Sequence, residues 1–183
     1  MTRRLSLLAV AFSLLLPAWA AEIPRPAPAM TIPLVNGTKI SLDQYKGKVL
    51  AVEFLLTTCP ACQRASQALN KVYNEYRAKG FEAVGVAINP MAHMLIPEYV
   101  ERFKINFPIG YNENQDQVKG FLQHPVIQIM KVPQLVFIDR TGVIRAQYSG
   151  VDPFFSNEEA NMRAEVEKLL SEPVAKAAAG KKK

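Results

Sequence analysis

Two cysteines stand two residues apart where a strongly apolar run gives way to a helix-forming segment. Cys59 and Cys62 are the only cysteines in the chain. The preceding run, Val49 to Leu56, is nearly continuously apolar, which is typical of a strand covered on both faces. Residues 63–79 then carry apolar side chains at helical spacing. A strand that delivers a C-x-x-C pair to the first turn of a helix indicates thiol–disulfide chemistry.

The first helical turn predicts different roles for the two thiols. Its free N–H groups and the positive end of the helix dipole favour a thiolate, the reactive form of cysteine. We therefore expect Cys59 to cap the helix and to act as the nucleophile. Pro60 then takes the first helical position, where its missing N–H costs nothing. Cys62, one turn further on, is expected to be more buried and to act as the resolving thiol.

The cysteine pair has two other interpretations. A purely structural disulfide closing so short a loop stabilises a protein by only about 2 kcal/mol, and a domain of this length does not need it. A metal site is the second alternative. Redox chemistry is favoured over both, and we expect neither a metal nor a cofactor.

Residues 1–20 are typical of a secretory signal peptide. Two arginines precede the apolar stretch Leu5 to Leu16, and the small residues Ala18 and Ala20 predict cleavage after Ala20. The alternative is an uncleaved membrane anchor, but the stretch is shorter than the roughly 20 residues that span a bilayer. We expect a periplasmic or secreted protein, in a compartment where disulfides persist.

The remaining chain is predicted to hold one domain. We expect an extended, proline-rich lead-in at residues 21–30, a domain at 31–172 and a flexible basic tail at 173–183. The formal net charge is +6, and outside the tail no basic cluster favours nucleic-acid binding. We expect a monomer that does not bind nucleic acid.

The order of predicted elements indicates an α/β fold. A turn at Asn36-Gly37 separates short extended segments, and Ser156 to Glu159 form a capping box before the last helix. Strands are expected at residues 48–56, 81–89, 107–109, 135–138 and 143–148, and helices at 63–79, 97–103, 115–122 and from 156 to Pro173. Such an order predicts a central mixed β-sheet with helices on both faces.

This order, with C-x-x-C opening the first helix, resembles the thioredoxin fold. More closely, it resembles the exported thiol–disulfide oxidoreductases related to the thioredoxin-like cytochrome-c-maturation reductases, in the redoxin branch of that superfamily. The matching stretches are residues 40–53, 57–62, 81–88 and 132–142. The resemblance implies a thioredoxin fold with an N-terminal β extension. It also implies disulfide reduction in substrate proteins, supported by a membrane-bound or exported thiol electron partner.

The resemblance assigns a role to Pro133. It matches the cis-proline that faces the redox pair in that family, and the alternative is an ordinary trans proline at a strand start. The backbone of Val132 would then pair with an incoming chain as an added strand. Thr58 and Pro60, on either side of Cys59, complete the expected substrate contacts.

The resemblance also assigns a role to Glu53, six residues before Cys59. It matches the buried acid that thioredoxins carry at that spacing. A glutamate within so apolar a strand is costly unless it has a purpose or a partner. Beneath the cysteines it would exchange a proton with Cys62. The alternatives are a glutamate at the sheet edge or one paired with a lysine.

Several departures leave the reduction potential open. Thr58 replaces the aromatic residue of thioredoxins, and Ala65 replaces a glutamate common in the reductase subgroup. The dipeptide Pro60-Ala61 matches neither thioredoxin nor the strong oxidants. Related sites span roughly −270 to −120 mV.

Two other functions share this fold. A peroxiredoxin-like peroxide reductase would carry threonine at Leu56 and proline at Val52, so the sequence argues against it. A copper-delivery protein would use soft thiolates, with His124 or Met130 as candidate further ligands, but that family spaces its cysteines by three residues. The segment from His124 to Met130 is longer than the usual link and is either a substrate-facing loop or an extra piece of helix.

Overall fold

The structure is a computed structural model that describes residues 21–173. The expected signal peptide and, apart from Pro173, the expected basic tail lie outside the described residues. Within the described part of the chain, no helix is both long enough and apolar enough to cross a membrane.

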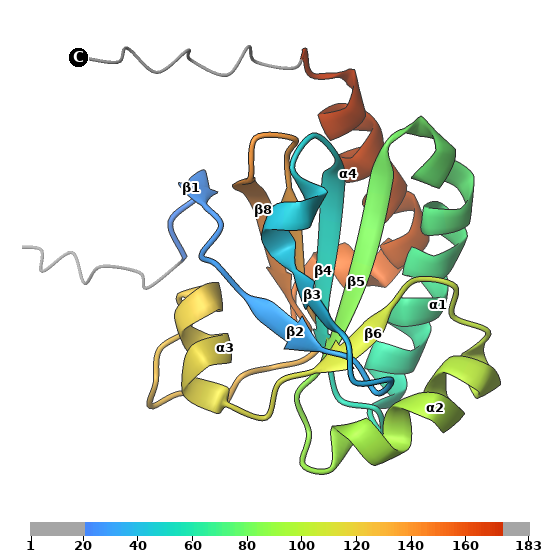
Figure 1. The fold of residues 1–183 in the computed structure, drawn as a ribbon. Helices are drawn as coiled ribbons and strands as arrows, with labels where there is room; N and C mark the ends of the chain where they lie inside the picture. The colour runs from blue at the N-terminus through green and yellow to red at the C-terminus, as the bar shows by residue number, and fades with distance from the viewer. Residues whose placement is uncertain (1–20, 174–183) are drawn as a thin grey trace, which may run out of the picture.

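A six-stranded mixed sheet forms the centre of the molecule, in the order β1-β8-β7-β4-β5-β6 (Figure 1). Its strands are β1 (Arg25–Pro26), β4 (Val49–Leu55), β5 (Phe81–Ala87), β6 (Ile109–Tyr111), β7 (Gln134–Ile138) and β8 (Val143–Ser149). The central strand β4 pairs in parallel with β5 and antiparallel with β7. The expected mixed α/β sheet is therefore confirmed.

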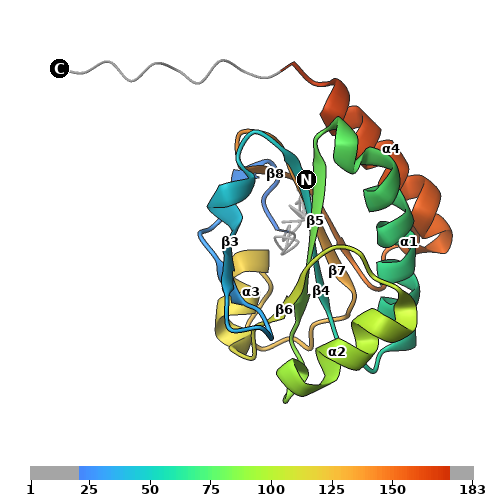
Figure 2. The same cartoon turned by 45° about the vertical axis from the view of Figure 1, so that its right-hand side comes forward.

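Helices cover both faces of this sheet (Figure 2). On one face lie α1 (Pro60–Tyr76), α2 (Ala92–Phe103) and α4 (Glu158–Ser171). On the other lie α3 (Gln115–Leu122) and the N-terminal segment. Successive side chains of a strand point to opposite faces. Val49, Ala51 and Leu55 therefore join the core under α1, whereas Leu50, Val52 and Phe54 join the core under α3.

The N-terminal segment forms the expected β extension and contributes one more strand to the main sheet. β2 (Thr31–Pro33) and β3 (Lys39–Ser41) pair antiparallel around a turn in which Gly37 has φ +83°, and a 3-10 turn (Leu42–Tyr45) follows. Earlier in the chain, β1 pairs with β8, and Arg25 is buried. Part of the expected lead-in is thus an edge strand of the main sheet.

Two helix starts differ from the sequence predictions. α2 begins at Ala92, not at Pro97, which lies inside the helix. The buried side chains of Ala92, Ile96 and Tyr99 fix this start, because they place one face of the longer helix against the core. The proline rule for helix starts was therefore misleading here.

The capping box predicted at Ser156 is also wrong. A 3-10 turn (Pro153–Asn157) precedes α4, and Asn157 occupies its N-cap position without a side-chain cap. The Ser156 hydroxyl instead donates to the Pro153 carbonyl. Asp152 caps the 3-10 turn by accepting from the backbone N–H of Phe154, so the capping residue stands four positions earlier than predicted.

Candidate redox site

The cysteine pair lies where β4 hands over to α1. Cys59 is the N-cap residue of the helix, and its backbone N–H donates to the carbonyl of Leu56. Its sulfur accepts the backbone N–H of Cys62 at 3.4 Å. Pro60 occupies the first turn, as expected. The backbone N–H of Cys62, in the first helical turn, is thus directed at the Cys59 sulfur.

The two thiols differ in exposure in the expected way. Both are free, with Cys59 half-buried and Cys62 fully buried. Burial raises the pKa of the Cys62 thiol well above its ordinary value, and the nearby Glu53 carboxyl raises it further. The Cys62 thiol therefore stays protonated at neutral pH unless a base removes its proton.

Glu53 occupies the middle of the central strand and is 1% exposed. It stands opposite Gly85 of β5 and Leu135 of β7, and strand alternation places it on the α1 face. A sheet-edge position is therefore excluded, and no ion pair found in the described residues includes it. Desolvation raises the pKa of this carboxyl to about 8, although a hydrogen bond from Ser66 opposes the rise.

Ser66 and Tyr99 lie next to this carboxyl, and neither residue is predicted from the sequence. The Ser66 hydroxyl donates to Oε2 of Glu53 at 2.7 Å, and the Tyr99 hydroxyl donates to Oγ of Ser66 at 2.8 Å. Ser66 follows Cys62 by four residues, so helical spacing alone places it on the same face of α1. Tyr99 has no comparable signal, because its position depends on how α2 packs.

Pro133 lies at the same edge of the sheet as the cysteines. It directly precedes β7, whose first residue pairs with Phe54 near the end of β4. The Val132–Pro133 peptide is cis, as expected from the resemblance. Val132 and Cys59 both border the core cluster under α1.

Gly150 closes this region from the end of β8, and it too was missed. A Cβ atom at Gly150 would stand 2.2 Å from the carbonyl oxygen of Val132. Such a contact is impossible without movement, so only glycine lets the two backbone segments approach in this way.

The turn before the cysteines is fixed by a buried hydrogen bond and borders a cavity. The backbone N–H of Thr57 donates to Oδ1 of Asn89, at 3.0 Å. Thr58 and Pro60 are exposed on either side of Cys59. A cavity of about 300 Å³ separates this turn from α2, and Tyr99 forms part of its wall.

The segment from His124 to Met130 is a loop, which excludes the alternative of an extra piece of helix. It joins α3 to β7 and leads directly to Pro133. Three of its apolar side chains, Val126, Ile127 and Ile129, are exposed, and Ile127 is 96% exposed. Whether it meets substrate stays a prediction.

The described residues offer no ready-made metal site. Between residues 21 and 173, no group of three or more histidine, cysteine or acidic side chains is arranged to hold a metal ion. Nδ1 of His124 lies 3.0 Å from its neighbouring carbonyl, that of Pro125. Nδ1 of His93 lies 3.8 Å from Oε1 of Glu113. Neither histidine therefore adds to a ligand set around the thiols.

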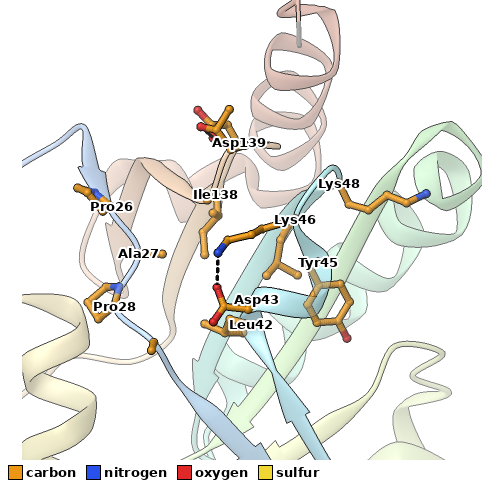
Figure 3. A pocket seen from close by; sticks show the side chains of 14 residues that line it. Pro26, Ala27, Pro28, Leu42, Asp43, Tyr45, Lys46, Lys48, Ile138 and Asp139 are labelled. Atoms are coloured by element: carbon orange, nitrogen blue, oxygen red, sulfur yellow. Dashed lines mark hydrogen bonds and ion pairs between the residues drawn. The ribbon is translucent and has the colours of Figure 1, made fainter. Parts of the chain in front are cut away.

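Another cavity, of about 230 Å³, lies at the opposite end of the sheet (Figure 3). Its wall includes Leu50 near the start of β4 and Ile138 at the end of β7. Lys46 and Asp43 also line it, and Nζ of Lys46 lies 2.7 Å from Oδ1 of Asp43. Because β4 runs from this end toward Cys59, the cavity is separate from the redox site.

Proteins similar to this chain in sequence are named thiol–disulfide oxidoreductases. The ResA thiol–disulfide oxidoreductase of Bacillus thuringiensis subsp. konkukian is 23% identical over 129 residues, covering 70% of each chain. The ResA protein of Geobacillus kaustophilus is 26% identical over 131 residues, covering 72% of this chain and 71% of the relative.

Solved structures match the fold. A thiol:disulfide interchange protein of the thioredoxin family from Chlorobium tepidum TLS superposes with a TM-score of 0.68 at 25% identity, covering 82% of this chain and 99% of the other. A protein described as thiol:disulfide interchange protein DsbE from Chlorobium tepidum superposes with a TM-score of 0.66 at 21% identity, covering 80% and 96%.

The AhpC/TSA family pattern matches residues 23–147, which include β4, the cysteine pair and β7. The match covers well over half of the chain. Together with the ResA relatives and the shared thioredoxin fold, it identifies the chemistry as thiol–disulfide exchange. The chain belongs to the AhpC/TSA family and is a thiol–disulfide oxidoreductase of the thioredoxin superfamily.

Proposed function

We propose that this protein reduces disulfides of substrate proteins in an exported compartment, with Cys59 and Cys62 as the redox pair. The observation that carries the proposal is the arrangement of two thiols and one carboxyl where β4 meets α1. A half-buried thiol caps α1, a fully buried thiol follows one turn later, and a buried carboxyl lies on the strand beneath the helix.

The first step is attack by Cys59. Its thiolate forms a bond to one sulfur of the substrate disulfide, and the substrate S–S bond breaks. The departing substrate thiolate takes a proton from water. The N–H groups of the helix terminus stabilise the attacking thiolate before this step. The product is a mixed disulfide between Cys59 and the substrate.

The second step is attack by Cys62. Glu53, as a carboxylate, takes the proton of the Cys62 thiol, and the resulting thiolate attacks the Cys59 sulfur. The mixed disulfide breaks, and the second substrate thiolate leaves and is protonated. The substrate gains two electrons, and the protein becomes the Cys59–Cys62 disulfide. A membrane-bound or exported thiol partner then restores the dithiol by the reverse exchange.

Substrate docking is proposed at the strand edge that precedes β7. The backbone of Val132 would pair with an extended substrate segment, as in other cases of strand addition. Thr58 and Pro60 flank the attacking sulfur and are exposed, so a docked chain would lie across them. The apolar loop at residues 124–130 extends this edge and would contact the substrate further from its disulfide.

Glu53 serves either direction of exchange, because the carboxylate that takes the proton of Cys62 when it attacks returns a proton when Cys62 leaves. The reductase direction rests on the resemblance to the cytochrome-c-maturation reductases. The exported compartment rests on the signal-peptide pattern of residues 1–20.

Single-cysteine variants test the proposal. Purified Cys62→Ala protein, mixed with a peptide disulfide, is expected to accumulate a mixed disulfide on Cys59, because nothing resolves it. Cys59→Ala protein should form little or no adduct. Mass spectrometry of the intact protein measures both. A faster reaction of Cys62 than of Cys59 would reverse the proposed roles.

The same preparation compares substrate classes. The reduced wild-type protein should release peptide thiols faster than it consumes hydrogen peroxide. Leu56 stands where a peroxidatic site needs threonine, so peroxide has no hydroxyl to orient it there. Faster turnover of peroxide would replace disulfide reduction by peroxide reduction as the function.

A further inference from the structure

A buried chain of hydroxyl groups runs from Glu53 back to α1. The Ser66 hydroxyl contacts Oε2 of Glu53 at 2.7 Å, and the Tyr99 hydroxyl contacts Oγ of Ser66 at 2.8 Å. The Tyr99 hydroxyl also stands 3.4 Å from the carbonyl oxygen of Cys62. All three side chains are buried. The chain therefore joins the carboxyl to the backbone of the resolving cysteine through two helices.

This chain has a complete set of hydrogen bonds in either charge state of Glu53. A hydroxyl donates one hydrogen bond and also accepts, and its proton rotates freely. With Glu53 ionised, Tyr99 donates to Ser66 and Ser66 donates to the carboxylate. With Glu53 protonated at Oε2, it donates to Ser66, Ser66 donates to Tyr99, and Tyr99 donates to the Cys62 carbonyl. Only hydroxyl rotations separate the two arrangements.

No other titratable group that faces Glu53 in the described residues stabilises its negative charge. The titratable groups that face it are Cys62 from α1, Tyr99 from α2 and Glu158 at the start of α4, and none of them is a cation. Its second oxygen, Oε1, is buried without a hydrogen-bond partner among the described residues. A buried charge without hydrogen-bond donors is strongly disfavoured. The hydrogen bond from Ser66 is therefore what allows the Glu53 carboxyl to ionise inside the core.

We propose that Ser66 and Tyr99 are positioning residues of the redox site, whose hydroxyl chain orients Glu53 and lets it gain and lose a proton inside the core. The inference rests on the proposed role of Glu53 in resolving the mixed disulfide.

The pH dependence of the second exchange step tests this inference. In Ser66→Ala protein the carboxylate loses its one hydrogen-bond donor among residues 21–173. The rate profile should therefore move to higher pH by about one pH unit, the equivalent of one hydrogen bond to a charged group. Tyr99→Phe keeps the ring and removes the second donor, so its profile should move the same way by less. Rapid mixing with a peptide disulfide measures the decay of the mixed disulfide.

Two controls separate positioning from a general structural effect. Tyr76→Phe removes a hydroxyl at the far end of α1, where it donates to Glu167. This variant should leave the pH profile of the second exchange step unchanged. In a Glu53→Gln background, neither Ser66→Ala nor Tyr99→Phe should shift it further. An unmoved profile in Ser66→Ala, or an equal shift in the Glu53→Gln background, would overturn the inference.

A direct titration keeps the test independent of activity. The carboxyl carbon of Glu53, followed by NMR against pH in the purified protein, should titrate at higher pH in Ser66→Ala than in wild type. If wild type released no peptide thiol, the proposed function would fail while this titration still decided the role of Ser66. If wild type were active and the titration unmoved, only the present inference would fail.

Discussion

At the scale of the residue, ionisation of Glu53 serves the proposed function but lowers the stability of the folded protein. Its side chain is fully buried in the central strand, and desolvation raises the pKa of its carboxyl from an ordinary value of 4.5 to about 8. The folded protein therefore binds this proton more tightly than the unfolded chain does. Below about pH 4.5 the carboxyl is neutral in both states and costs nothing, and the cost grows as pH rises toward 8.

The free energy of unfolding of the reduced protein should thus fall by a few kcal/mol between about pH 5 and pH 8. This window lies below the range in which free cysteine thiols ionise, near pH 8.5. Glu53→Gln should abolish most of this slope, because an amide does not titrate. Urea unfolding at several pH values measures it, with Glu82→Gln on the neighbouring strand β5 as the matched control. An equal slope in the Glu53→Gln protein would show that other groups cause it.

At the scale of the element, the end of β8 supports the segment that leads into β7. Gly150→Ala would force a Cβ atom against the Val132 carbonyl and displace the proposed docking edge. Exchange with peptide disulfides should slow by about tenfold or more, since misplacement by about 1 Å is enough to cost this much. The rate at which a small alkylating reagent labels Cys59 should stay unchanged, because α1 is untouched.

The control for that substitution is Gly120→Ala. Gly120 lies in α3, where an added Cβ atom meets no neighbour within 4 Å. This variant should exchange at the wild-type rate. Equal behaviour of Gly150→Ala and Gly120→Ala would contradict the proposed role of the edge before β7.

Elements with a strong local signal were predictable, and those governed by packing were not. The apolar run of β4 and the turn at Gly37 fixed their elements, and α3 has the predicted bounds. The starts of α2 and α4 differed, because buried contacts outweighed the proline and capping rules. Local patterns describe a segment alone, whereas a helix start also depends on what the extra turn buries.

At the scale of the whole molecule, the sheet brings distant segments to one edge. The end of β4, the start of β7 and the end of β8 meet there. Cys59, Val132 and Gly150 therefore lie in the same region of the molecule. The C-x-x-C pattern predicted the cysteines, and the family resemblance predicted roles for Glu53 and Pro133. Ser66, Tyr99 and Gly150 were missed, because their contacts arise only when separate elements pack together.

The most direct test of the account is the product of one turnover. Fully reduced wild-type protein is mixed with one equivalent of a peptide disulfide, quenched with acid and analysed by mass spectrometry after digestion. The account predicts an intramolecular Cys59–Cys62 disulfide, formed with the loss of two hydrogen atoms, and two peptide thiols in matching amount. Intact peptide disulfide beside a protein that still carries both free thiols would contradict it.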